Sequence, residues 1–159
     1  MQVTVTLSLP RQPSTVTRAR QVLTTLLSVT DADEEVRDHL AVLISEGCAN
    51  AVMHSYPGST VDIAIVIDDN TCLIEIGNRG ASPDDAGLHA GLPDPLTVGG
   101  RGLPFIAALA DNAAFVDERT GQVLLRIRKS LAATHADSPA TEHRADSSAV
   151  DRTTPNKSR

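Results

Sequence analysis

The alternation of apolar and polar residues predicts three strands in the first two thirds of the chain. Residues 2–8 alternate with a period of two, and Pro10 and Pro13 would end this strand. A similar pattern recurs in Thr60–Ile67 and, more briefly, in Thr71–Ile76. Two aspartates and an asparagine separate these last two segments, which is favourable turn composition. We therefore expect the second and third strands to form a hairpin.

Between the first two strands, apolar residues recur every three or four positions and predict two helices. The first helix covers 14–28, with Ser14 as a candidate N-cap. The second begins after Thr30 or Asp31, either of which could cap it, and runs to about Ser55 before a Pro-Gly turn. Two glutamates in its first turn favour the positive end of the helix dipole.

The chain then contains a long segment without any period, 79–99, which is rich in Gly, Pro and Asp. Ordered loops of this length are uncommon within a compact domain, and they are often lids or binding loops. A third helix is predicted over Gly102–Ala110. A closing antiparallel pair, Ala113–Val116 and Val123–Ile127, is predicted to follow it.

This order of elements, β-α-α-β-β-loop-α-β-β, predicts an α+β two-layer sandwich. We expect a mixed, mostly antiparallel sheet with the helices on one face. From about Leu131 the composition changes to Ala, Ser, Thr, Pro and mixed charge, and such a segment cannot offset its ordering entropy by burial. The predicted domain therefore covers 1–130, and 131–159 is predicted to be a disordered tail.

Composition narrows the class of protein further. The 159 residues carry a formal charge of -6 and show no stripe of Lys and Arg, which argues against direct binding of nucleic acid. No apolar run approaches the roughly 20 residues of a membrane span, and the N-terminus has no apolar signal region. We therefore expect a cytoplasmic protein that acts without a membrane. Cys48 and Cys72 lie in apolar runs and are expected to be buried small hydrophobes.

The first candidate site is a polar row on the second predicted helix. Glu46, Asn50 and His54 are four residues apart and share one helix face, beside the small residues Gly47 and Ala51. A carboxylate, an amide and an imidazole next to residues that permit close approach are typical of a site. The same row also suits the solvated face of an amphipathic helix, and the spacing alone does not decide between them.

The second candidate is a glycine cluster, Gly99-Gly100-Arg101-Gly102, that opens the third predicted helix. Free N–H groups at the positive end of a helix dipole form an anion site, and Pro104 suits the first turn. A flexible linker before a helix would have the same composition. The third candidate, Ile76–Gly80, is a strand that runs into a turn, and by itself it reads as a plain strand end. All three together suit a nucleotide that lies under a mobile lid.

These residues resemble the motifs of the GHKL (Bergerat-fold, histidine-kinase-like) ATP-binding family. Glu46-x-x-x-Asn50-Ala51-x-x-His54 is similar to its N box, and Ile76-Gly77-Asn78-Arg79-Gly80 lies at the adenine-binding G1 box. Gly100-Arg101-Gly102-Leu103 lies at the G2 box. The resemblance covers roughly residues 3–130. It is greatest to the small stand-alone anti-sigma-factor serine kinases of bacteria.

The resemblance implies a role for each N-box residue. Asn50 would hold Mg²⁺, an oxygen-seeking ion that bridges nucleotide phosphates. Glu46 would be the base that orients or deprotonates an attacking hydroxyl. His54 would lie at the cofactor site, where packing or a supporting hydrogen bond is favoured over chemistry.

The two glycine boxes would hold the ATP itself. Arg101 and the N–H groups around Gly100 and Gly102, followed by Leu103, would surround the phosphates. At the adenine end, Asn78 and Gly80 would contact the base. The family normally has an aspartate where this chain has Asn78, and an amide lacks the charge of a carboxylate. The resemblance therefore predicts weaker or altered nucleotide binding.

Two functions follow from these features. The first is an ATP- and Mg²⁺-dependent protein serine/threonine kinase that acts as an anti-sigma factor and phosphorylates an anti-sigma-factor antagonist. The second is a binding module that sequesters a sigma factor, with weak ATP binding or none. In either case the partners would be a sigma factor, an antagonist protein or both. Dimers are common in the family, so a homodimer is compatible with the resemblance.

Overall fold

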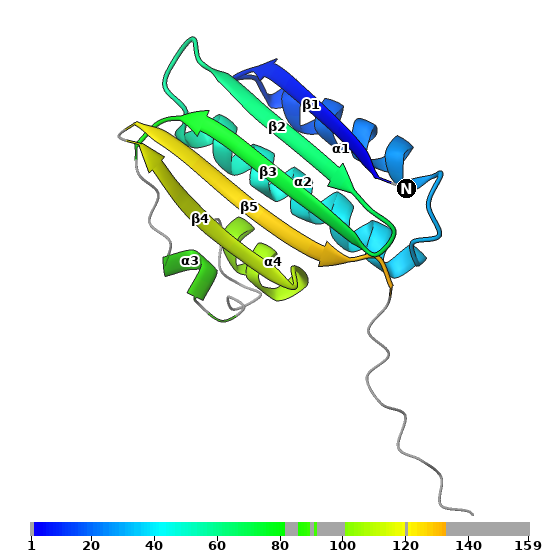
Figure 1. Cartoon of the computed structure of the whole chain (residues 1–159). Coiled ribbons are helices and arrows are strands. Elements are labelled where there is room, and N and C mark those ends of the chain that lie inside the picture. The colour runs from blue at the N-terminus through cyan, green and yellow to red at the C-terminus, as the bar shows by residue number, and fades with distance from the viewer. Residues whose placement is uncertain (1, 82–85, 90, 92–100, 120, 133–159) are drawn as a thin grey trace, which may run out of the picture.

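Five strands form one antiparallel sheet in the order β1-β2-β3-β5-β4 (Figure 1). This computed structural model describes residues 2–81, 86–89, 91, 101–119 and 121–132. Every pairing in the sheet is antiparallel, and the helices lie on one face of it. The predicted α+β two-layer sandwich is therefore confirmed. Among the described residues, no helix is both long and apolar enough to cross a membrane.

The elements follow one another in the predicted order, with one short helix in addition. Their bounds are β1 Val3–Pro10, α1 Pro13–Leu27, α2 Glu34–His54, β2 Thr60–Ile67, β3 Thr71–Arg79, α3 Ala86–His89, α4 Gly102–Leu109, β4 Asn112–Arg119 and β5 Gln122–Ser130.

The hydrophobic core lies between the sheet and the helices. Helix α2 packs against α1, α4 and strands β2, β3 and β5, so it is the central element of the helical layer. Alternate residues of the strands face it, as the period of two predicts. The largest fully buried side chains are aliphatic: Leu23, Leu27, Leu40, Leu43, Ile44, Val61, Ile63, Ile65, Ile74, Ile76, Ile106 and Ile127.

Helix α1 begins one residue earlier than predicted, at Pro13, and its N-cap is Gln12 rather than Ser14. Proline suits the first helical position because its missing N–H would have no partner there. The buried Thr15 donates its hydroxyl to the Pro10 carbonyl oxygen at 2.6 Å. This bond ties the first turn of α1 to the end of β1.

The N-cap position of α2 is Asp33, and the expectation of Thr30 or Asp31 was wrong. Thr30 instead ends the preceding helix, because its hydroxyl donates to the Leu27 carbonyl oxygen at 2.8 Å. The Arg37 guanidinium donates to the carbonyl oxygens of Thr30 and Ala32, at 2.8 and 2.9 Å. One arginine from α2 therefore holds the α1–α2 loop.

Strand β2 has the predicted bounds, and the other four strands are longer than their side-chain patterns suggested. β3 continues to Arg79, which pairs with Gln122 of β5. The segment 79–99 contains the short helix α3, and most of its other residues lie outside those described. Leu131 is 5% exposed and belongs to the core, one residue beyond the predicted domain. The predicted tail from residue 133 onward lies outside the described residues.

The turn between β2 and β3 is held by one carboxylate. Asp68 accepts hydrogen bonds from the backbone N–H groups of Asn70 and Thr71, at 2.9 and 2.6 Å, and from the Thr71 hydroxyl. These bonds favour the charged form and lower the pKa of Asp68 below its usual value. The Asp-Asp-Asn turn expected from the sequence is therefore present.

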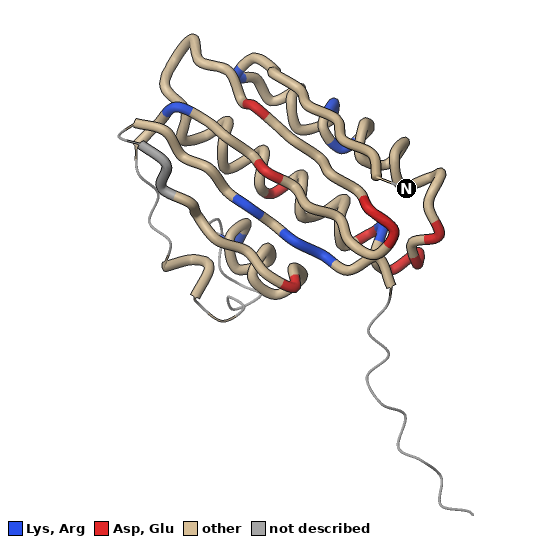
Figure 2. The backbone as a smooth tube through the Cα atoms, in the orientation of Figure 1, with Lys and Arg blue, Asp and Glu red and all other residues tan. Residues whose placement is uncertain are grey.

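The second face of the sheet is not covered by any described helix (Figure 1). Its exposed or half-buried side chains include an ion pair between Arg126 and Glu75 at 2.6 Å. Figure 2 shows basic residues along β5. Cys48 and Cys72 are both buried and free, as expected, and burial raises the pKa of each thiol to about 12.

Candidate functional site

The polar row of α2 lies at the border between its buried face and solvent. Glu46 and Asn50 are half-buried, and His54 is exposed at the last position of the helix. Neither Glu46 nor Asn50 uses its side chain in a hydrogen bond with another described residue. The carboxylate and the amide therefore have no hydrogen-bond partner among the described residues.

The carboxylate of Glu46 lies against the first residue of α4. A methyl group added at Gly102 would be 2.8 Å from Glu46 Oε2. Glycine at this position therefore lets the start of α4 approach α2, with which α4 packs. The structure brings the acid of the predicted N box and the glycine of the predicted G2 box into direct contact.

Helix α4 begins at Gly102, after Arg101 at the N-cap position. Arg101 makes no side-chain capping bond, and the first turn is closed by the bond from Phe105 N–H to the Arg101 carbonyl oxygen at 3.0 Å. The N–H groups of Gly102 and Leu103 therefore have no acceptor within the helix. Arg101, Gly102 and Leu103 are half-buried, and Gly100 lies outside the described residues.

The other end of α2 meets the end of β3. Gly80 forms a bridge with Ser55, and Tyr56 N–H donates to the Arg79 carbonyl oxygen at 2.8 Å. A methyl group added at Gly80 would collide with the His54 carbonyl oxygen. Gly80 therefore allows a close approach of strand and helix backbones, a packing role that the motif alone did not indicate.

Asn78 lies on the helix-facing side of β3, two residues before this contact. It is 8% exposed, and its amide nitrogen would be 2.9 Å from a methyl group at Gly80. Its side chain makes no hydrogen bond with another described residue. A buried amide of this kind favours a polar ligand.

Gly47, which the sequence places beside the polar row as a residue that permits close approach, allows α2 to pack closely on the sheet. Gly47 is buried in α2, and a methyl group there would be 2.5 Å from the Ile76 Cδ1 atom. Glycine is unfavourable in the interior of a helix, and this cost could have indicated from the sequence that Gly47 has a packing role. It lets the residues around Glu46 lie close to the sheet.

The two other stretches singled out in the sequence thus lie against the second half of α2, with Glu46 near Gly102 of α4 and the His54 backbone near Gly80. The profile of the histidine kinase-like ATPase domain matches residues 9–129, which is most of the chain. The chain belongs to this family. Membership of this family supports ATP binding by the chain.

The chain is also similar to a chain in the crystal structure of the SiaB-SiaC complex from Pseudomonas aeruginosa. The two share 19% sequence identity with a TM-score of 0.55, over 79% of this chain and 89% of that chain. At this identity the likeness shows a common fold. A search of curated proteins finds no match.

Proposed function

We propose that this protein is an anti-sigma factor with ATP-dependent serine kinase activity, and that its substrate is an anti-sigma-factor antagonist. The observation that carries the proposal is the contact between Glu46 and Gly102, the first residue of α4. The contact supports the proposal because Glu46, as the base, would then act beside phosphates held at the start of α4, one helical turn from Asn50. Family membership supports the ATP-binding part of the proposal.

The chemistry of the donor set fits ATP and Mg²⁺. Asn50 offers an amide oxygen, and Mg²⁺ prefers oxygen ligands while keeping several waters. Among the described residues, no group of three or more His, Cys, Asp or Glu side chains is arranged to hold a metal. Asn50 would hold the ion through its amide oxygen.

The residues of the site would then act as follows. The N–H groups of Gly102 and Leu103, with the Arg101 guanidinium, would hold the phosphates at the positive end of α4. When bound, ATP with Mg²⁺ supplies the γ-phosphoryl group and neutralises its charge. Glu46 would orient a serine hydroxyl of the antagonist and accept its proton. Asn78 would accept a hydrogen bond from the adenine amino group.

Transfer of radiolabelled phosphate from ATP to a candidate antagonist tests the proposal. We expect Glu46→Gln to lower the rate at least about 100-fold, because general base catalysis contributes on that order, and to leave ATP binding in place. Glu34→Gln, in the first turn of the same helix, is the matched control. Transfer that is unchanged in Glu46→Gln contradicts the assigned role.

A second function is favoured by Asn78, since the family normally has a carboxylate at this position. In this alternative, the protein captures a sigma factor without catalysis and binds ATP weakly or not at all. The similar Pseudomonas aeruginosa chain occurs in a complex with another protein, which supports partner binding in both proposals. Persistent sigma-factor capture without phosphate transfer to any candidate would favour the alternative.

A further inference from the structure

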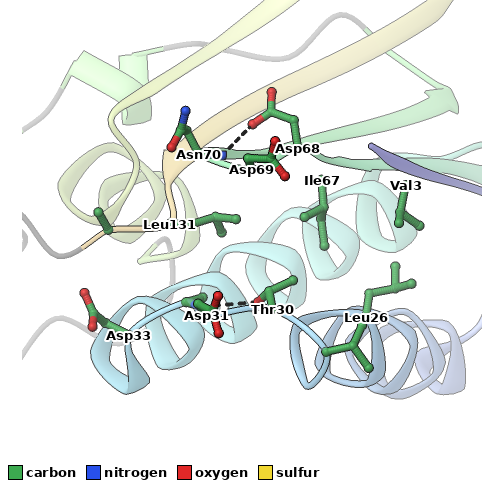
Figure 3. Close-up of a pocket in the computed structure, with 13 residues that line it drawn as sticks. Val3, Leu26, Thr30, Asp31, Asp33, Ile67, Asp68, Asp69, Asn70 and Leu131 are labelled. Atoms are coloured by element: carbon green, nitrogen blue, oxygen red, sulfur yellow. Dashed lines mark hydrogen bonds between the residues drawn. The ribbon is translucent and has the colours of Figure 1, made fainter. Parts of the chain in front are cut away.

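A second cavity lies at the end of the sandwich remote from the candidate ATP site. Its volume is about 460 Å³, and it opens between the α1–α2 loop and the β2–β3 turn (Figure 3). Asp33, which lines it, precedes α2, whereas Asn50 is 17 residues further along. At 1.5 Å per helical residue these positions are about 25 Å apart. The cavity is therefore separate from the site around Glu46.

The floor of this cavity is apolar. Val3 of β1, Leu26 of α1, Ile67 of β2 and Leu131, the residue after β5, face the opening (Figure 3). Val29, also in the lining, is 72% exposed. A concave surface of this kind can take an aliphatic side chain.

The rim of the cavity is acidic. Asp31 and Asp33 belong to the α1–α2 loop, and Asp68 and Asp69 belong to the β2–β3 turn. All four are exposed, and Figure 2 shows acidic residues in both loops at this end of the molecule. The described residues of the lining include no Lys or Arg. Outside the lining, Arg37 is bonded to loop carbonyl oxygens, and Arg128 of β5 contributes to lowering the pKa of Asp68.

The chain itself contains a segment of complementary chemistry. After Leu131, Val150 is the only large aliphatic residue, and the segment that starts with it carries Arg152, Lys157 and Arg159 against the single acid Asp151. The preceding residues, 133–149, have the opposite balance, with three acids and one arginine. The positive charge of this part of the sequence is thus concentrated in the segment 150–159, which begins with Val150.

The connection also starts at the cavity, because Leu131 and Ala132 line it. A flexible coil as long as 133–149 would have a root-mean-square span of about 20 Å, which is enough for the chain to return to the cavity. Tethering at this distance gives an effective concentration in the millimolar range, so a weak interaction is sufficient. We propose that residues 150–159 bind this cavity, with Val150 on the apolar floor and the basic side chains at the acidic rim.

Paramagnetic relaxation tests this proposal in the full chain. A nitroxide is attached through Ser158→Cys, and the buried Cys48 and Cys72 thiols stay unmodified in the native state because burial raises their pKa to about 12. We expect the amide signals of residues 30–33 and 68–70 to lose about half of their intensity at low salt. They should recover at about 0.5 M sodium chloride, where exposed charges are screened.

Two variants identify the groups responsible. Reversing the three basic residues to glutamate (Arg152→Glu, Lys157→Glu, Arg159→Glu) should abolish the signal loss, and so should Asp31→Asn with Asp69→Asn. Asp62→Asn with Glu75→Gln removes two charges from the open sheet face instead and should leave it intact. Absence of signal loss, or loss that persists in both of the first two variants, overturns the proposal.

A mixed sample separates docking within one chain from docking between chains. Nitrogen-15-labelled chain without nitroxide is mixed with unlabelled chain that carries it. The proposal predicts that residues 30–33 and 68–70 keep their intensity in this mixture. Loss of their signals there would assign the cavity to a second copy and contradict intramolecular docking. The experiment contains no ATP, so its outcome is independent of the proposed kinase activity.

Discussion

At the scale of single residues, Asn78 is expected to set nucleotide affinity. It is 8% exposed on the helix-facing side of β3, with no side-chain hydrogen bond to a described residue. An amide can accept one hydrogen bond from an adenine amino group, but it can also present its NH₂ group instead. A carboxylate at the same position would accept without that ambiguity and with charge assistance.

Asn78→Asp is therefore expected to tighten ATP binding about tenfold, which corresponds to about 1.4 kcal/mol. Without ATP, the buried carboxylate should lower the free energy of unfolding by about 1–3 kcal/mol. Titration with labelled ATP and denaturant unfolding measure the two effects. Asn70→Asp, in the exposed β2–β3 turn, is the matched control. Equal ATP affinity in Asn78→Asp and the unchanged protein would contradict this role.

Gly80 and Gly102 are both motif glycines, but the structure gives them different neighbours. A methyl group at Gly80 meets backbone, the carbonyl oxygen of His54, which cannot move without shifting the end of α2. A methyl group at Gly102 meets the end of the Glu46 side chain, which can rotate away. Stability should therefore depend on Gly80 and activity on Gly102.

Gly80→Ala is expected to lower the free energy of unfolding by about 2–3 kcal/mol, because overpacking against backbone forces a shift. Gly91→Ala is the control, since a methyl group there has nothing within 4 Å. Denaturant unfolding followed by circular dichroism measures both. A change in Gly80→Ala as small as that in Gly91→Ala would show that the close approach to His54 is not needed.

Gly102→Ala is expected to change the free energy of unfolding by less than about 1 kcal/mol, because the Glu46 side chain can give way. Phosphate transfer should fall, since the displaced carboxylate no longer orients the hydroxyl. The transfer assay and a denaturation curve on the same preparation measure the two quantities. A stable Gly102→Ala protein with full transfer would argue against the position assigned to Glu46.

At the scale of elements, α2 determines how the site is assembled. The distance between α2 and the sheet depends on Gly47. The methyl group of an alanine there would be 2.5 Å from Ile76 Cδ1. Replacing glycine by alanine stabilises a helix by about 1 kcal/mol. The clash with Ile76 destabilises the folded protein, so the two effects on the free energy of unfolding oppose each other. The clash is with the end of a flexible side chain.

A double-mutant cycle separates these two contributions. Gly47→Ala should lower the free energy of unfolding by about 1–2 kcal/mol, and Ile76→Val by about 1 kcal/mol. Together they should cost less than their sum, because removing Cδ1 makes room for the new methyl group. Thermal and denaturant unfolding of the four proteins give the coupling. Additive changes in the free energy of unfolding would show that the residue at position 47 does not pack against Ile76.

The sequence predicted which elements exist better than where they end. Strand β3 extends three residues beyond the apolar pattern because Gly77, Asn78 and Arg79 still pair with β5 through their backbones. Side-chain periodicity carries no information about such pairing. The cap of α2 was misassigned for a related reason, since Thr30, Asp31 and Asp33 are all suitable residues and the bond from Thr30 to Leu27 depends on the folded loop.

At the scale of the whole molecule, the order of elements was sufficient to predict a sandwich with helices on one face. The position of β5 between β3 and β4 was not predicted. The contact between Glu46 and Gly102, 56 residues apart, needed the fold because no local pattern brings α2 and α4 together. The same limit applied to the acidic cavity, whose lining comes from segments throughout the chain.

A nuclear magnetic resonance titration of the nitrogen-15-labelled full chain with ATP and Mg²⁺ tests the position of the nucleotide site most directly. We predict chemical-shift changes in the amides of residues 46–54, 78–80 and 101–105, with none in 68–70. Replacing Mg²⁺ by EDTA should weaken binding, and Asn50→Ala should remove this dependence on the metal. Shift changes confined to the acidic cavity, or none at millimolar ATP, would contradict a nucleotide site around the second half of α2.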